Sequence, residues 1–149
     1  MFDISKVDRA TELFIFDIYI ASLKIKKVAD EFDNVQELLY DFRSWDSIIR
    51  EFEIIGEASK YLLKDGLVSK EYQIVVDLRN YITHEYFGVN QDRIWNIVYN
   101  DLDIYIGIVI DLIRDIEPNL KVELIESFIE DNNYLDFVVK ALEELKDAK

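Results

Sequence analysis

Residues that break helices are scarce in this chain. Its 149 residues include one proline, Pro118, and four glycines. Folds rich in β-strands need more turn-forming residues than this, so the scarcity favours long helices joined by short loops. Half of the residues are hydrophobic, and at this length we expect one compact core rather than two.

Apolar side chains recur at helical spacing in five segments. The predicted segments cover about 3–32, 34–64, 69–86, 90–118 and 120–146.

Capping and helix-breaking residues mark the ends of these predicted helices. Asp3 or Ser5 can cap the first segment, and Ser69 the third. Gly66 can close the second segment, and Pro118 is expected to stop the fourth. A break is possible near Ser44 in the second segment, and another is expected at Asn132 and Asn133 in the fifth. The sequence therefore predicts an all-α fold, an antiparallel four-helix bundle over residues 1–117 with a C-terminal amphipathic helical extension over residues 118–149.

Several functional classes are excluded by composition. The chain has no cysteine, which rules out disulfides, thiolate zinc sites and a cysteine nucleophile. The first residues carry no signal-peptide pattern. The longest apolar stretch, residues 104–110, is too short to span a bilayer. We expect a soluble cytoplasmic protein without membrane contact.

The net charge of −14 argues against broad electrostatic binding of nucleic acid. It equally suits a basic protein partner. The segment from Asp77 to Arg93, however, contains three acidic and two basic residues. This stretch is therefore close to neutral, and most of the excess negative charge lies elsewhere.

That stretch carries the candidate chemistry. The sequence DLRNYITHEYFGVN, residues 77–90, holds the only histidine of the chain, His84. On a regular helix Asn80 and His84 share one face, and Arg79 and Tyr86 share another nearby. A loosened last turn would bring both faces to one cleft.

These residue types suit cleavage of an RNA phosphodiester. Imidazole titrates near neutral pH and can serve as general base or general acid. Guanidinium grips phosphate through two parallel hydrogen bonds and offsets the negative charge that builds during attack by the ribose 2′-hydroxyl. This chemistry requires no metal and no cofactor.

The number of histidines suggests that the site needs a second copy of the chain. The reaction needs both an acid and a base, yet each chain supplies one histidine. A twofold dimer with the third segment at its interface would place two copies of His84 and of Arg79 in one cleft. We therefore expect a symmetric homodimer with a composite site.

A structural role for the same residues stays open. His84 near a helix C-terminus could be a cap stabilised by the helix dipole, and Arg79 could pair with Asp77 or Glu85. Spacing alone favours this alternative.

A family resemblance shifts the balance toward chemistry. Residues 79–86, RNYITHEY, resemble the Arg-x4-His-x-Tyr motif of the HepT-like toxins, a branch of the HEPN ribonuclease superfamily. The segments IIGEASK at 54–60, FGV at 87–89 followed by IW at 94–95, and NDL at 100–102 resemble stretches around that motif. The likeness covers about residues 5–115 and leaves the C-terminal extension unmatched.

The resemblance implies a HEPN-like four-helix bundle, a homodimer and a metal-independent endoribonuclease with Arg79 and His84 catalytic. It implies a supporting role for Asn80, which would orient His84 or hold phosphate. Glu57 is a second supporting candidate, which either pairs with Arg79 or faces solvent. The implied partner is an MNT-type nucleotidyltransferase antitoxin of a type VII-like toxin–antitoxin pair, which would silence the toxin by AMP transfer to Tyr86.

The expected substrate is single-stranded RNA or an exposed tRNA end, because the sequence shows no basic groove for a long duplex. Two alternatives remain. The chain could be a non-catalytic HEPN-type partner or substrate-binding subunit of a nucleotidyltransferase, or a purely structural helical protein.

Overall fold

The computed structural model describes residues 10–84 and 88–147, and within these ranges it contains helices and no strand. The elements are α1 (Thr11–Ala29), α2 (Val35–Tyr40), α3 (Phe42–Lys64), the 3₁₀ turn η2 (Lys70–Tyr72), α4 (Gln73–His84), α5 (Gln91–Asn96), the π-helical turn η4 (Ile97–Asp101), α6 (Leu102–Arg114), α7 (Pro118–Asp131) and α8 (Asp136–Asp147). The all-α prediction is confirmed.

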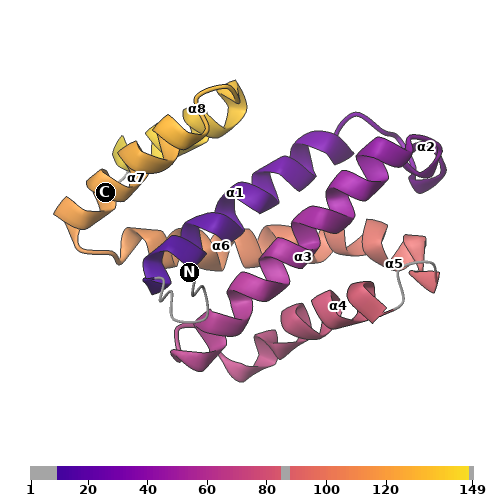
Figure 1. The fold of residues 1–149 in the computed structure, drawn as a ribbon, viewed down its shortest axis with the longest axis horizontal. Coiled ribbons are helices and arrows are strands. Elements are labelled where there is room, and N and C mark those ends of the chain that lie inside the picture. The colour runs from indigo at the N-terminus through magenta and orange to yellow at the C-terminus, as the bar shows by residue number, and fades with distance from the viewer. Residues whose placement is uncertain (1–9, 85–87, 148–149) are drawn as a thin grey trace, which may run out of the picture.

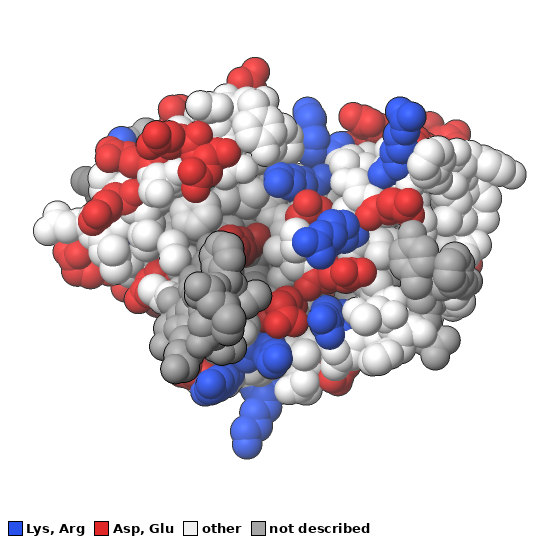
Figure 2. Space-filling model, viewed as in Figure 1, with Lys and Arg blue, Asp and Glu red and all other residues white. Residues whose placement is uncertain are grey.

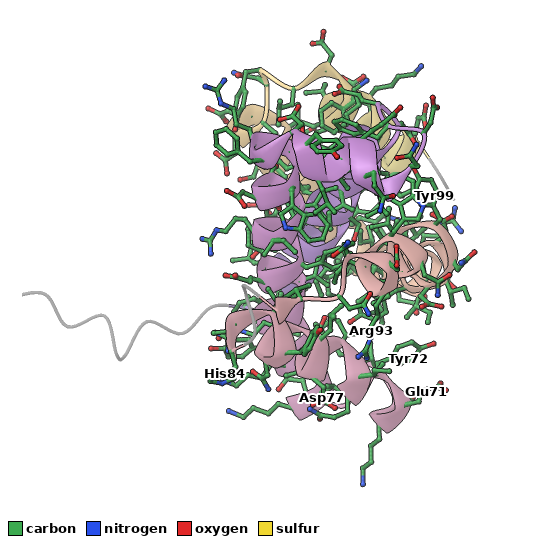
Figure 3. The ribbon with its side chains drawn as sticks, turned by 90° about the vertical axis from the view of Figure 1, so that its right-hand side faces the viewer. Glu71, Tyr72, Asp77, His84, Arg93 and Tyr99 are labelled. Atoms are coloured by element: carbon green, nitrogen blue, oxygen red, sulfur yellow. The ribbon has the colours of Figure 1, made fainter. Side chains whose placement is uncertain are left out.

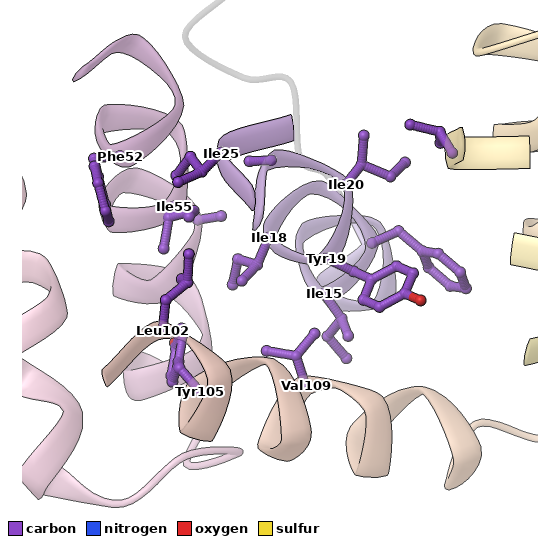
Figure 4. Packing of buried hydrophobic residues seen from close by; sticks show 14 of the residues in the cluster. Ile15, Ile18, Tyr19, Ile20, Ile25, Phe52, Ile55, Leu102, Tyr105 and Val109 are labelled. Carbon is purple, nitrogen blue, oxygen red and sulfur yellow. The ribbon is translucent and has the colours of Figure 1, made fainter. Parts of the chain in front are cut away.

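Four antiparallel rods form the bundle: α1, α3, α4 and the continuous run of α5, η4 and α6 (Figure 1). Helix α1 packs against α3 and α6, and α3 also packs against α4. The core lies where α1 meets α3 and α6, as Figure 4 shows for Ile18, Ile55 and Val109. Each of these side chains is at most 2% exposed. Their removal from water supplies the main stabilisation of the bundle.

Short polar side chains set several helix starts. Asn34, Asp41 and Asn90 each accept a hydrogen bond from the backbone N–H three residues ahead, at the start of α2, α3 and α5 respectively. These bonds satisfy N–H groups that a helix cannot pair internally. The break in the second predicted segment therefore falls at Asp41, three residues before Ser44.

Other boundaries partly match the prediction. Gly66 has a φ of 72° after α3, the left-handed conformation expected of a glycine cap. Ser69 precedes η2, and its hydroxyl donates to Glu71 rather than capping a backbone N–H. The predicted caps Asp3 and Ser5 lie outside the described residues.

The expectation for Pro118 is wrong in detail. Helix α6 already ends at Arg114, and Pro118 is the first residue of α7. Proline suits this place because the first turn of a helix does not use its backbone N–H. The carboxylate of Glu117 caps the same turn by accepting from the N–H groups of Asn119 and Leu120, and these bonds lower the pKa of Glu117.

Helices α7 and α8 form a hairpin against the outer side of α1, well away from α4 (Figure 1). The break at Asn132 and Asn133 is confirmed. Phe128 stacks on Phe16 of α1 with ring centroids 5.0 Å apart. Acidic side chains gather over this hairpin, whereas basic side chains lie mostly over α1 and α3, interleaved with acidic ones (Figure 2). On the face shown, the acidic excess is therefore concentrated over α7 and α8.

No helix in the described ranges is both long and apolar enough to cross a bilayer.

Candidate functional site

Helix α4 carries the candidate residues. Its apolar positions Val76, Leu78 and Ile82 are buried, which fixes the rotation of the helix about its axis. Residue 84, the predicted base or acid, is the last residue of α4, and its side chain is exposed. Figure 3 shows His84 at one end of α4, with Asp77 further along the helix. An exposed imidazole at a helix end is accessible to a substrate.

Arg79 lies on the side of α4 that faces α3. One guanidinium nitrogen, Nη2, is 3.6 Å from Oε2 of Glu57, and the other, Nη1, donates to Oδ1 of Asn80 over 3.1 Å. The side chain of Arg79 is 34% exposed, so its guanidinium is held on two sides and still reaches solvent. Of the two possibilities for Glu57, the pair with Arg79 is the one observed. Lys60 shares the same carboxylate at 4.0 Å.

The predicted site residues therefore fall into two groups. Arg79, Asn80 and Glu57 contact one another. Among the described residues, no hydrogen bond joins His84 to any of these three. The amide of Asn80 orients Arg79 here. Tyr86, the predicted site of AMP transfer, lies outside the described residues.

Helices α3 and α4 are in close contact at Gly56. A Cβ built on this glycine would lie 2.1 Å from Cβ and 2.8 Å from Cγ of Arg79, and 3.2 Å from the carbonyl oxygen of Val75. No larger residue fits there without moving Arg79 or α4. The sequence alone does not single out this contact, because Gly107 also lies inside a predicted helix and an added Cβ there would meet nothing within 4 Å.

Tyr81 is a second residue without a predicted role. Its hydroxyl accepts from the backbone N–H of Asn90 over 3.0 Å and donates to the carbonyl of Gly88 over 3.5 Å. The guanidinium of Arg93 lies 5.4 Å from the centre of its ring. Tyr81 thus ties the start of α5 to α4 one turn before His84. Only the folded chain reveals this contact.

Two depressions flank α4. On the α3 side, Arg79 lines a charged depression of about 270 Å³ together with Phe14, Arg50, Glu53 and Glu57. On the other side, between α4 and the run from α5 to α6, lies an apolar groove of about 420 Å³. We call this second depression the α4–α6 groove.

The α4–α6 groove has apolar walls and a polar rim. Ile74 and Ile104 stand at its edges and are 60% and 63% exposed. At its floor, Tyr105 and Ser59 share a buried hydrogen bond of 2.7 Å. Burial raises the pKa of Tyr105, and the bond to Ser59 opposes that rise. Polar side chains come from α5 and the π-helical turn, namely Arg93, Asn96 and Asp101.

Within the described ranges, no group of three or more His, Cys, Asp or Glu side chains is arranged to hold a metal ion.

Comparison with known proteins identifies the family. Residues 18–112, which include Gly56, Glu57, Arg79 and His84, match the family described as Ribonuclease HepT-like. The chain is 35% identical over 111 residues to a Methanocaldococcus jannaschii protein named "Putative RNase MJ0127", covering 70% of this chain and 88% of that protein. It is 29% identical over 97 residues to "Putative RNase MJ1380" of the same organism, covering 63% of this chain and 88% of the relative. No solved structure gives a significant match. The chain belongs to the HepT-like ribonuclease family.

Proposed function

We propose that the chain is a metal-independent endoribonuclease in which Arg79 and His84 act in a cleft shared by two protomers. The observation that carries the proposal is that α4, in a chain of the HepT-like ribonuclease family, bears both the guanidinium of Arg79 and the imidazole of His84. Helix α4 carries Arg79, whose guanidinium lies between Glu57 of α3 and the neighbouring Asn80, and it exposes His84 at its end. A fixed, partly exposed guanidinium and an accessible imidazole are what phosphate transfer needs.

The reaction is attack by a ribose 2′-hydroxyl on the adjacent phosphorus. One imidazole takes the hydroxyl proton as the new P–O bond forms. The bond from phosphorus to the 5′-oxygen breaks, and an imidazolium gives that oxygen a proton. The guanidinium of Arg79 holds the phosphate oxygens as their negative charge grows. The products are a 2′,3′-cyclic phosphate and a 5′-hydroxyl end.

The second protomer supplies the second imidazole, since each chain contains one histidine. The α4–α6 groove is the proposed contact between protomers. It runs beside the helix that carries His84, and exposed isoleucines stand on both of its edges. Apolar surface of this kind on a strongly charged protein is typical of an interface.

The rim of the groove is compatible with twofold symmetry. Arg93 and Asp101 both line it and carry opposite charges. In a twofold interface each residue meets the partner's surface in a reciprocal way, so Arg93 of one protomer can face Asp101 of the other twice.

The proposed setting is a type VII-like toxin–antitoxin pair. An MNT-type nucleotidyltransferase would act as the antitoxin and transfer AMP from ATP to Tyr86, two residues from His84. The added phosphodiester charge and bulk would compete with substrate phosphate for Arg79. The substrate proposed is single-stranded RNA or a tRNA end, because the sequence shows no basic run for a long duplex and the face seen in Figure 2 carries basic side chains interleaved with acidic ones.

The test is cleavage of RNA by the purified protein in the presence of EDTA, with end-group analysis. His84→Ala is expected to lose cleavage and growth inhibition by on the order of 100-fold or more while keeping its fold. Arg79→Ala is expected to behave alike. Arg114→Ala is the matched control and should keep wild-type cleavage, because Arg114 is an arginine of α6 paired with a carboxylate, Asp111, at 3.8 Å and lines neither depression beside α4. Undiminished cleavage by His84→Ala would refute the proposal.

Modification is tested separately. Incubation with the cognate nucleotidyltransferase and ATP should add one adenylyl mass to the wild type and none to Tyr86→Phe. An adenylyl group on any other residue would contradict the assignment of Tyr86.

A second candidate function is a non-catalytic partner or substrate-binding subunit of a nucleotidyltransferase. The acidic surface over α7 and α8 and the existing ion pair of Arg79 favour it. In that case the dimer would bind the enzyme tightly, and RNA would stay whole at every protein concentration tested.

A further inference from the structure

We infer that Gly56 is a positioning residue for Arg79, and that Gly56 and Glu57 together form a seat on α3 for its side chain. This inference rests on the proposed function, because the purpose of the seat is to hold the guanidinium where phosphate transfer needs it. We call these two residues the arginine seat.

Geometry carries the first half of the argument. The stem of Arg79 lies directly over the missing side chain of Gly56, since an added Cβ would come within 2.8 Å of Cγ and 2.1 Å of Cβ. Distances below about 3.0 Å do not occur between real Cβ atoms and their neighbours. The stem is not a flexible side-chain end that can swing aside. Any side chain at position 56 must push Arg79, or all of α4, away from α3.

The charged end of Arg79 is held by an ion pair with α3. The residue after Gly56 on α3 is Glu57, whose carboxylate lies 3.6 Å from the guanidinium. The stem is thus fixed at one residue and the charged end at the next. Asn80 holds the other terminal nitrogen. A guanidinium held this way loses little rotamer freedom when phosphate binds, so more of the binding energy goes into stabilising the transition state.

Another glycine of the chain shows that this packing is specific. Gly107 lies within α6, and an added Cβ there would meet nothing within 4 Å. It has no comparable packing role. Gly107→Ala is therefore a matched control, the same chemical change in a helix without the crowding.

The first experiment measures single-turnover RNA cleavage at a temperature where circular dichroism shows each variant fully folded. Gly56→Ala is expected to lower the rate by on the order of 10- to 100-fold, because a misplacement of about 1 Å costs up to about 100-fold in rate. Gly107→Ala should stay within about twofold of the wild type. Wild-type cleavage by Gly56→Ala would overturn the inference.

A double-mutant cycle separates positioning from general damage. If Gly56 acts through Arg79, Gly56→Ala should cause no further loss of rate in an Arg79→Gly background, which lacks both side-chain atoms that the added methyl group would strike. An undiminished further loss in that background would mean that the substitution harms the enzyme by another route, and the arginine seat would be refuted.

A second cycle uses thermal unfolding and needs no RNA. Arg79→Gly removes both atoms that an added methyl group would strike. The Tm loss caused by Gly56→Ala should therefore shrink clearly in the Arg79→Gly background, whereas the effect of Gly107→Ala should be the same in both backgrounds. If Gly56→Ala does not fold, recovery of a folded protein in Gly56→Ala/Arg79→Gly supports the seat, and failure to recover overturns it.

The two cycles distinguish the two proposals. If the wild type cuts no RNA, the proposed function fails, and the Tm cycle alone decides the seat. Additive Tm losses would then overturn the seat as well.

Discussion

The two long sides of α4 differ in how completely they are covered. On the α3 side, contact is so close that Gly56 has no room for a side chain, and Arg79 is held by Glu57. On the α6 side, an apolar groove of about 420 Å³ stays open, edged by Ile74 and Ile104. The α3 side of α4 is thus packed by the same chain, whereas part of its α6 side is left uncovered.

The difference suggests a division of labour. Tight packing makes a side chain immobile, which suits a group that must meet a phosphate in one fixed geometry. Apolar surface exposed to water is unfavourable, and covering it lowers the free energy of the protein. Such a surface therefore suits the contact with a second protomer. His84 stands at the end of α4, where both sides meet. The α3 side would then fix the arginine, and the α6 side would bring the symmetry mate.

The largest expected effect comes from charging the open side. In Ile74→Asp/Ile104→Asp, two carboxylates in each protomer would be buried at the proposed interface without partners. We expect loss of the dimer and a drop in RNA cleavage on the order of 100-fold, with a nearly unchanged fold because both isoleucines are already more than half exposed. Light scattering and a cleavage assay measure the two effects.

Leu120→Asp is the control for that experiment. Leu120 is an apolar residue of α7, 36% exposed and remote from α4. It should leave both the dimer and cleavage intact. A double variant that remains dimeric and active would show that the α4–α6 groove is not the interface.

A smaller effect is expected at the floor of the same groove. Tyr105→Phe removes the buried hydroxyl that bonds to Ser59 and leaves Ser59 without that partner. The free energy of unfolding should fall by about 1 kcal/mol, measured by urea denaturation, while the dimer persists. Tyr99→Phe, which removes a more exposed hydroxyl bonded to the carbonyl of Ala29, should cost less. Equal losses of unfolding free energy in the two variants would mean that burial of the Tyr105 hydroxyl does not strengthen its contribution to stability.

The smallest effect concerns a part of α3 that faces away from α4. Burial raises the pKa of Glu51 above its usual value of 4.5, against the opposing pull of Lys24 and Arg50. The folded protein therefore holds this proton to a higher pH than the unfolded chain, and the contribution of Glu51 to stability falls as the pH rises through that window. Glu51→Gln should have a slightly higher Tm than the wild type at neutral pH.

That gain should shrink as the pH falls toward 4.5 and below, where Glu51 is protonated in both states. Cleavage of RNA should not change, because Glu51 touches neither side of α4. A constant gain at all pH values would rule out titration of Glu51 as its cause.

The sequence predicted most of the fold because helix periods and caps are local properties. The breaks near Ser44 and at Asn132, the cap at Gly66 and the start at Asn90 were all within a few residues of the observed boundaries. The prediction for Pro118 is wrong because a proline ring, which cannot continue a helix, suits the first position of the next one. The sequence does not predict the π-helical turn over residues 97–101, a rare element for which helical spacing of apolar residues gives no signal.

The candidate site was less accessible to prediction. Arg79 and His84 stood out by residue type and by the family motif, and their catalytic roles stay predictions. The contact of Arg79 with Gly56 and the hydroxyl contacts of Tyr81 depend on how α3, α4 and α5 cross. Such contacts join residues far apart in the chain or across a turn, and a single sequence does not encode them in a readable pattern.

The central claim is that two protomers share one catalytic cleft, and mixing subunits tests it most directly. Wild type and His84→Ala are combined in equal amounts, allowed to exchange subunits, and assayed for RNA cleavage. If both imidazoles are needed, only wild-type dimers cut, and activity should fall to about a quarter of the value for the same total amount of pure wild type. A value of about half, with exchange verified, would mean that each chain carries an independent site and would contradict the account.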